Sequence, residues 1–308
     1  MNKKNTIALI VLLIVGGLYF ILNMNEPTEK SFYYFGENSD NFQTIVLTDT
    51  TGSITLVKNN DVWEMTDPVE SPVKKSKADN LIKKLTETKS SSLPISVSQK
   101  GQVTYNVTDS LGTLITILDK DGNTIRKAII GKSDNPNFSH ARHPESTEIY
   151  QLSENLVWSI KPDVKSWREN QILNLDTENI VDFQVVTQDR NYQFTYADSL
   201  WNFTENDFTH DVKDDNPVMR KLLNHFKSLR AVDFLDKEFE NYEELLNNPH
   251  LSVKINTSDE GTKILTVIPY DKTNDLLQMG SQKSPLYLIQ KNMKENFNFD
   301  LDELVNKK

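Results

Sequence analysis

The chain has 308 residues, of which 34 are basic, 44 are acidic and none is cysteine. Its formal net charge of −10 at pH 7 argues against binding to the phosphate backbone of nucleic acids. Without cysteine, this chain can form no disulfide bond, thiol nucleophile or cysteine-bound metal site.

The first 25 residues resemble a membrane anchor. A short basic start is followed by seventeen uncharged residues from Thr6 to Leu22. At about 1.5 Å per residue they reach roughly 25 Å, near the lower limit for a transmembrane helix. A cleaved signal peptide shares this pattern, but the bulky residues that end the run offer no small-residue cleavage site. We therefore predict an uncleaved anchor over residues 1–25, followed by a polar linker over 26–41.

Charge predicts the orientation of this anchor. Lys3 and Lys4 precede the apolar run, whereas Glu26 and Glu29 are the first charges after it. The positive-inside rule then keeps the N-terminus in the cytoplasm. We expect a single-pass protein of the cytoplasmic (inner) membrane, with most of the chain in the periplasm or outside the cell.

From Phe42 onward the sequence repeats itself once, at an offset of about 138 residues. Alternating apolar residues match between the copies, and Trp63 falls on Trp201. A scarce tryptophan at the same place in the same order of elements is a stronger signal than matching strands alone. We predict module one over 42–160, an inter-module segment over 161–179 that packs against both modules, and module two over 180–308.

Each module combines short strands with one amphipathic helix. In module one, apolar residues at helical spacing predict a helix from Ala78 to Leu85. In module two, Asn216 and Pro217 fit the N-cap and first position of the matching helix. Gly122 and Gly261 mark corresponding hairpins. Strands are expected around Thr51-Gly52 and at 62–65, 93–97, 113–118, 124–130 and 149–152. The predicted fold class is α+β, two tandem copies of a mostly antiparallel sheet plus helix, preceded by one transmembrane helix.

His140 and His143 are the candidate metal ligands. Two imidazoles could bind zinc if Glu145 or Glu148 supplied a further ligand. On a strand, however, positions three apart point to opposite faces. The stretch aligned with them in module two, Leu277 to Gly280, contains no histidine. A solvated strand edge is therefore the preferred interpretation, and we predict no metal or cofactor.

Other candidate motifs fail on their spacing. Gly131-Lys132-Ser133 resembles the end of a phosphate-binding loop, but the required earlier glycine is Arg126. We therefore predict no nucleotide binding. The sequence has no G-x-S-x-G, H-E-x-x-H or calcium-loop motif, and no catalytic residue is assigned. Trp63 and Trp201 could stack on sugars, but their equivalent positions favour a role in the repeated framework.

Several short segments, taken in order, resemble the domain-of-unknown-function 4340 family over roughly residues 40–300. They are 62–65, 78–85, 129–132, 138–142, 148–152, 167–176 and 200–203. Residues 105–108 depart from the family pattern, which has Gly-Leu and Pro before the central strand. The resemblance implies a membrane-anchored, extracytoplasmic protein without an assigned activity, often encoded beside ABC-type transport components, including gliding-type systems.

The leading functional hypothesis is a non-enzymatic accessory protein that binds a protein partner in the cell envelope. A second hypothesis is a carbohydrate- or peptide-binding module that uses an inter-module groove and exposed aromatic residues. A third is a metal-dependent hydrolase built around His140 and His143.

Overall fold

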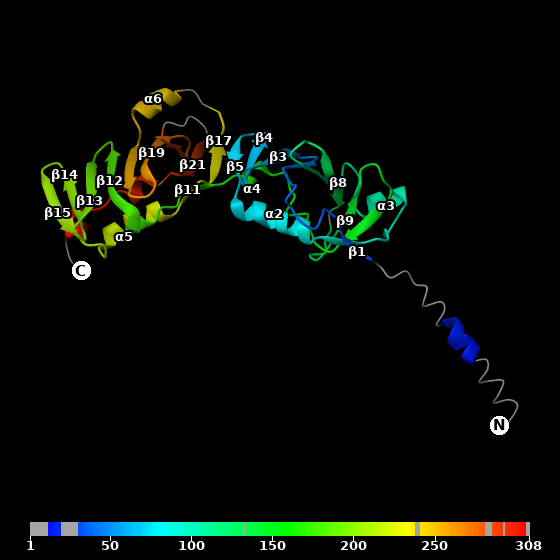
Figure 1. Ribbon diagram of the computed structural model, residues 1–308. Helices are drawn as coiled ribbons and strands as arrows, with labels where there is room; N and C mark the ends of the chain where they lie inside the picture. Colours follow the sequence, from blue (N-terminus) through cyan, green and yellow to red (C-terminus); the bar gives the residue numbers. More distant parts are fainter. Residues whose placement is uncertain are drawn as a thin grey trace. The chain divides into compact units, whose positions relative to one another are not determined.

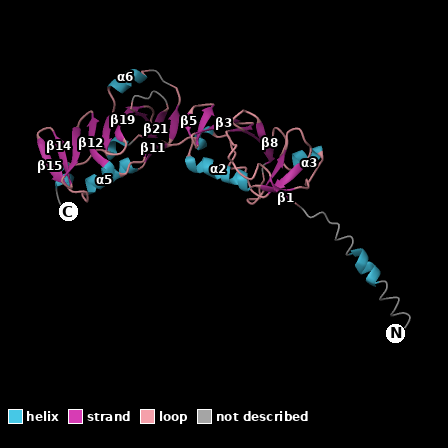
Figure 2. Ribbon diagram, in the orientation of Figure 1, coloured by secondary structure: helices cyan, strands magenta, loops and turns pink. Residues whose placement is uncertain are grey.

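The computed structural model describes residues 12–19, 30–131, 133–237, 241–280, 285–291 and 293–305. This part of the chain is a sheet-rich α+β protein whose paired strands run antiparallel (Figures 1 and 2). It divides into two compact units. Unit 1 comprises residues 1–58 and 76–162, and unit 2 comprises residues 59–75 and 163–308.

Residues 12–19 are helical. The remainder of the predicted span from Thr6 to Leu22 lies outside the described residues. Within the described ranges, no helix is both long and apolar enough to cross a membrane.

Unit 1 contains a sheet in the order β1-β6-β10-β9-β8-β7-β2-β3. Its elements are β1 (Ser31–Tyr33), β2 (Thr44–Asp49), β3 (Gly52–Asn59), α2 (Lys75–Glu87), β6 (Lys89–Ser91), α3 (Gln99–Thr104), β7 (Thr113–Leu118), β8 (Thr124–Gly131), β9 (Ser139–Arg142) and β10 (Ile149–Leu152). Alternation of apolar and polar residues builds the core: Ile45 pairs with Ile117, and both are fully buried. The helix predicted from Ala78 to Leu85 is confirmed as α2.

Unit 2 contains a sheet in the order β15-β14-β13-β12-β18-β19-β20-β21-β17. Its strands are β12 (Ile180–Thr187), β13 (Asn191–Ala197), β14 (Leu200–Glu205), β15 (Phe208–Val212), β17 (Asp233–Leu235), β18 (Leu251–Thr257), β19 (Gly261–Pro269), β20 (Asn274–Met279) and β21 (Leu286–Gln290). Two separate strand pairs are β4 (Val62–Asp67) with β5 (Ser71–Pro72), and β11 (Gln171–Leu173) with β16 (Leu229–Arg230). The helical elements are α4 (Val164–Trp167), η1 (Thr177–Asn179), α5 (Pro217–Lys227), α6 (Tyr242–Asn247), α7 (Met293–Asn296) and α8 (Leu301–Val305).

Helix α5 packs on the aromatic core of unit 2. Its predicted start is confirmed, because the Asn216 side chain accepts a hydrogen bond from the Val218 amide at 2.8 Å and Pro217 opens the helix. Phe226 on the buried face meets the Phe183 ring edge-on, with ring centroids 5.0 Å apart. This edge-to-face arrangement is the favoured geometry for aromatic pairs.

Two local predictions change. The strand predicted at Leu93 to Val97 is wrong, because only Ser96 forms a bridge, to Ile149. Pro94 lies in the middle of that segment and has no backbone amide to donate, which prevents a continuous ladder. Part of the predicted linker instead forms β1, and the adjoining Tyr34 and Phe35 are buried in unit 1.

Candidate functional site

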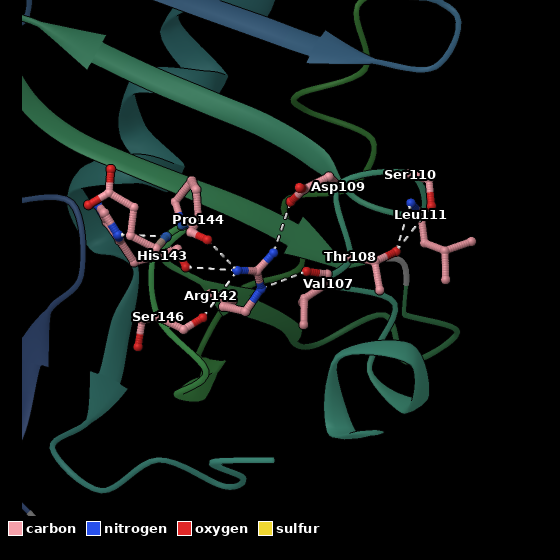
Figure 3. Close-up of polar contacts among 10 residues, drawn as sticks. Val107, Thr108, Asp109, Ser110, Leu111, Arg142, His143, Pro144 and Ser146 are labelled. Carbon is pink, nitrogen blue, oxygen red and sulfur yellow. Dashed lines mark hydrogen bonds and ion pairs between the residues drawn. The ribbon is translucent and has the colours of Figure 1, made fainter. Parts of the chain in front are cut away.

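Arg142, at the end of β9, organises the most densely hydrogen-bonded polar site of unit 1 (Figure 3). Its side chain is buried and its Nε donates to the Val107 carbonyl at 2.9 Å. One terminal nitrogen donates to the carbonyls of His143, Pro144 and Ser146 at 3.1, 2.7 and 3.1 Å. The other donates to Asp109 at 3.0 Å.

This arrangement fixes two loops with one guanidinium. Four backbone carbonyls satisfy most of its donors, and a buried cation needs such partners to offset its desolvation. Asp109 supplies the only formal countercharge among these contacts, and its side chain is 86% exposed. Arg142 therefore ties the 107–109 loop to the 143–146 loop, with each of its nitrogens occupied by a protein acceptor.

The two loops border a cavity of about 270 Å³ in unit 1. Asp109 and Pro144, both held by Arg142, are among its lining residues. The other lining residues are Thr48, Asp49, Thr50, Leu114, Lys127 and Ile129. The cavity combines a pair of carboxylates and one ammonium group with a small apolar wall, which suits a small polar ligand.

The two histidines beside Arg142 occupy different environments. His140 is half-buried between Tyr105 and Phe138, with ring centroids 4.7 and 5.5 Å away. Its Nδ1 is buried without a hydrogen-bond partner, and burial lowers the pKa of the imidazole. His143 is exposed, and its Nδ1 accepts a hydrogen bond from the Glu145 amide at 3.2 Å. Across the described ranges, no group of three His, Cys, Asp or Glu side chains is placed to hold a metal ion.

The sheet register gives His140 a counterpart in unit 2. Gly131 pairs with His140, and Pro269, 138 residues further along, pairs with Asp275. On the other side, His140 faces Gln151 and Asp275 faces Ile289, which are again 138 apart. The alignment of His140 with the stretch from Leu277 was therefore wrong. The connection before β9 has three more residues than the connection before β20, which shifts the register.

Asp275 is a buried carboxylate that the sequence did not single out. It is 1% exposed, and neither carboxylate oxygen has a hydrogen-bond partner. Burial raises its pKa, while the positive charges of His250, Lys291 and Lys294 act in the opposite direction. Both sheets thus hold an incompletely paired titratable group at the same position.

Unit 2 contains a larger groove of about 620 Å³ between α5, η1 and the β13–β14 hairpin. Exposed Tyr196 lies 5.0 Å from the buried ring of Trp201, whose Nε1 donates to Asp214 at 2.7 Å. The groove is lined by Thr177, Glu178, Ile180, Tyr196, Trp201, Asp214, Arg220, Leu223, Asn224 and Lys227. An aromatic surface beside both signs of charge is suited to a polar ligand with an apolar face.

The two predicted framework tryptophans are buried. Trp63 lies in β4 and Trp201 in β14, and both belong to unit 2. The Trp201 indole contributes an edge to the groove, whereas Tyr196 presents the accessible ring.

A second buried arginine, Arg168, joins the 59–75 segment to the rest of unit 2. Its Nε donates to the Ser71 hydroxyl at 3.2 Å, and a terminal nitrogen donates to Asp236 at 2.8 Å. The guanidinium stacks on Phe234, with its carbon 3.9 Å from the ring centre. The Trp167 carbonyl also accepts a hydrogen bond from the Lys74 amide at 2.9 Å.

A family model described as a domain of unknown function, DUF4340, matches residues 63–249, more than half of the chain. The chain belongs to this family. The DUF4340 match contains Arg142, Arg168 and most of the lining of the unit 2 groove. Neither the comparison with curated proteins nor that with solved structures gave a match. Membership in DUF4340 therefore identifies a family without assigning a reaction.

Proposed function

We propose that this DUF4340 protein is a non-enzymatic binding protein, anchored in the cytoplasmic membrane by residues 6–22, with both units outside the cytoplasm. The uncharged run from Thr6 to Leu22 and the lysines before it support this orientation. The helical conformation of residues 12–19 agrees with the anchor.

We also infer that the two units are copies of one module. The strand order β6-β10-β9-β8-β7-β2-β3 in unit 1 matches β17-β21-β20-β19-β18-β12-β13 in unit 2. The register matches as well: Ile45 pairs with Ile117, and Phe183 pairs with Ile255, each shifted by 138 residues. Duplication of one gene segment accounts for both observations.

Trp158 carries the proposal of a protein partner. Its side chain is 79% exposed, whereas the other three tryptophans of the chain are buried. Tryptophan is among the residues most enriched at the centres of protein interfaces, because it buries a large apolar area with few rotatable bonds. A fully displayed indole in an acidic, polar chain therefore supports a binding surface at this turn.

The turn that presents Trp158 is rigid. Leu156 and Ile160 on either side are fully buried, and the Ile160 amide donates to the Leu156 carbonyl at 3.1 Å. Lys84 of α2 donates to the Asn155 carbonyl at 2.9 Å. Because the backbone is already ordered, a partner that covers Trp158 loses little conformational entropy on binding.

Photocrosslinking from position 158 tests the proposal. A photoreactive phenylalanine analogue at Trp158, in the full chain in cell membranes, is expected to give one major adduct with a protein. The family resemblance implies that this protein is a component of an ABC-type transport system, and mass spectrometry of the adduct tests that expectation. The matched control carries the analogue at Val181, which is exposed in β12.

The expected adduct should form at position 158 and be absent at 181. Lipid adducts alone at 158, or the same protein adducts at both positions, would contradict a partner site at this turn. Trp158→Ala should leave the unfolding midpoint unchanged, because the indole contributes little to the core.

A second candidate function is binding of a carbohydrate or peptide in the unit 2 groove, favoured by exposed Tyr196 beside Arg220 and Glu178. A glycan and peptide array probed with the full chain in detergent would detect such a ligand. Tyr196→Ala should abolish any signal from this groove. Tyr270→Ala removes a similarly exposed tyrosine outside the groove and should have no effect.

A further inference from the structure

One stretch of unit 1 lacks negative charge. Residues 88–108 contain no Asp or Glu, in a chain with 44 acidic residues, but include Lys89 and Lys100. Lys30 adds a third positive charge beside this stretch, because its carbonyl accepts a hydrogen bond from the Ser92 amide at 2.8 Å. This local charge favours an anionic partner.

The same stretch exposes a series of apolar side chains. Leu93, Ile95 and Val97 are 46, 41 and 63% exposed, and they alternate with less exposed residues. Val103, on the following helix α3, is 61% exposed. Apolar residues scattered singly over a surface are common, but four within eleven positions form a local apolar surface.

The backbone of this segment is firmly held. The Ile95 amide donates to the Ile149 carbonyl, and the Ile149 amide donates to the Ser96 carbonyl, both at 2.8 Å. Gly101 of α3 lies so close to Ser96 that a Cβ there would be 2.4 Å from its hydroxyl oxygen. The apolar side chains therefore face solvent because the folded backbone points them outward.

The segment also lies beside the point where the chain enters unit 1. Phe32 of β1 pairs with Ser90 of β6, and Lys30 is bonded to Ser92. Lys30 follows Leu22, the last residue of the proposed anchor, by eight positions. Eight residues span at most about 27 Å, so the anchor keeps this edge of unit 1 near the bilayer.

We propose that Leu93, Ile95, Val97 and Val103 form a membrane-facing surface that inserts into the boundary between headgroups and acyl chains. Lys30, Lys89 and Lys100 then lie at the level of anionic phospholipid headgroups. The occupant is the bilayer that holds the anchor, so this inference rests on the proposed membrane anchoring. The surface acts as a second attachment that fixes how unit 1 meets the membrane.

Because the chain contains no cysteine, single labelling sites can be introduced cleanly. Full-length Ile95→Cys and Val97→Cys, each labelled with a polarity-sensitive fluorophore, would be reconstituted in phosphatidylcholine–phosphatidylglycerol vesicles. Spin-labelled lipids then report contact with the bilayer by quenching. Thr51→Cys, in the exposed turn between β2 and β3 at the opposite edge of the sheet, is the matched control. Leu13→Cys reports separately on insertion of the anchor.

Quenching and a blue-shifted emission at 95 and 97, with neither at 51, are the expected results. Quenching at 13 without quenching at 95 and 97 would overturn the membrane-facing surface and leave the anchor intact. No quenching at 13 would overturn the anchor, and the signals at 95 and 97 would still decide the surface on their own. Equal quenching at 51 and 95 would also overturn the proposal.

A charge-reversal variant supplies the second measurement. Ile95→Glu with Val97→Glu places two acidic groups in the acid-free stretch, at exposed positions that do not hold the fold. A probe at Val103→Cys in this background should lose its lipid quenching and keep an unchanged far-ultraviolet circular dichroism spectrum. Retained quenching would count against the surface. If crosslinking showed that a second copy covers Val97 in place of lipid, the bilayer assignment would be wrong.

Discussion

At the scale of single residues, unit 1 and unit 2 bury charge in opposite ways. Arg142 is surrounded by acceptors, so its charge is stabilised by carbonyl dipoles as well as by Asp109. Asp275 is equally inaccessible but has no donor on either oxygen. The first arrangement costs little to keep ionised, whereas the second disfavours the charged form. Stability should therefore respond differently to the removal of each charge.

Replacing Arg142 by methionine should lower the free energy of unfolding by about 3 kcal/mol, because buried acceptors lose charged donors. Asp109→Asn should cost less than about 1 kcal/mol, since that carboxylate is solvated. Urea denaturation of both variants measures the difference. Similar losses for the two variants would mean that the ion pair, not the carbonyl network, holds the loops.

The Asp275 carboxyl makes a contribution to stability that depends on pH. Its pKa is raised in the folded state above the ordinary value of 3.8, so the folded protein binds the proton more tightly than the unfolded chain. This contribution is present at low pH and is lost as the pH rises through the folded pKa. His250, Lys291 and Lys294 reduce the effect and Asp271 adds to it.

Asp275→Asn should remove that dependence. The stability difference between variant and parent should shift in favour of the variant between about pH 4 and pH 7. Thermal unfolding midpoints at several pH values would measure it, with Asp271→Asn as the exposed control. A constant difference across this range would show that Asp275 titrates normally.

At the scale of elements, Gly131 explains how β8 meets the loop before β7. A Cβ at this position would lie 2.1 Å from the Tyr105 carbonyl oxygen and 2.8 Å from a Val107 methyl group. The glycine that resembled part of a phosphate-binding loop is therefore required for close backbone packing. It also brings the Val107 carbonyl to a position where Arg142 can reach it.

Gly131→Ala should destabilise the protein by more than about 2 kcal/mol, because the loop must move away from β8. Gly122→Ala is the control: the hairpin has open space, and only the positive φ of 82° opposes the substitution. That change should cost about 1 kcal/mol. Chemical denaturation separates the two, and equal costs would rule out the packing explanation.

The cap of α5 links two elements. Asn216 accepts from the Val218 amide, and its side-chain nitrogen donates to the Leu304 carbonyl in α8 at 3.0 Å. Asn216→Ala should cost about 1–2 kcal/mol. Asn216→Asp keeps the acceptor but loses the donor, so a stability between those of the parent and the alanine variant is expected. If the aspartate variant matched alanine, the contact with α8 would dominate.

Local sequence patterns predicted the elements that depend on local chemistry. Helices α2 and α5 have apolar faces and recognisable starts, and the Gly122 and Gly261 hairpins have a residue suited to positive φ. The Leu93 to Val97 segment has the composition of a strand, but its pairing depended on a partner edge and was blocked at Pro94. Strand β1 was missed because its pairing with β6 joins residues far apart in sequence.

The candidate site was less accessible to prediction. The sequence drew attention to residues 140–143 because histidine is a metal ligand, yet Arg142 is the residue with the dense contacts. Its partners are mostly backbone carbonyls, which leave no side-chain pattern. Exposure of Trp158 and burial of Asp275 depend on tertiary packing, and no local signal in the sequence reports either.

At the scale of the whole molecule, the two units are interleaved along the chain. Unit 2 contains residues 59–75, which precede most of unit 1 in sequence. The segment supplies the β4–β5 pair, the Ser71 hydroxyl that receives the Arg168 side chain, and the Lys74 amide bonded to Trp167. A boundary drawn once along the sequence cannot separate the units.

A fragment that begins at Asp163 should therefore fold poorly, because Arg168 and Trp167 lose these partners. We expect broad thermal unfolding for residues 163–308, and a sharper, higher transition when a peptide of residues 59–75 is added. A chain of residues 30–308 should unfold cooperatively. A fragment 163–308 that melts like the longer chain, with no response to the peptide, would show that the segment is dispensable.

The placement of residues 59–75 also limits how such a protein can change over evolutionary time. A unit that relies on seventeen residues encoded within its neighbour's stretch of gene is not inherited as a separate block. Loss of the first half would remove the strand pair on which the second depends, and loss of the second half would leave that pair without its support. A third tandem repeat would need its own donated strands. The pair can diverge in sequence, but recombination that shortens or lengthens it must carry the shared segment along.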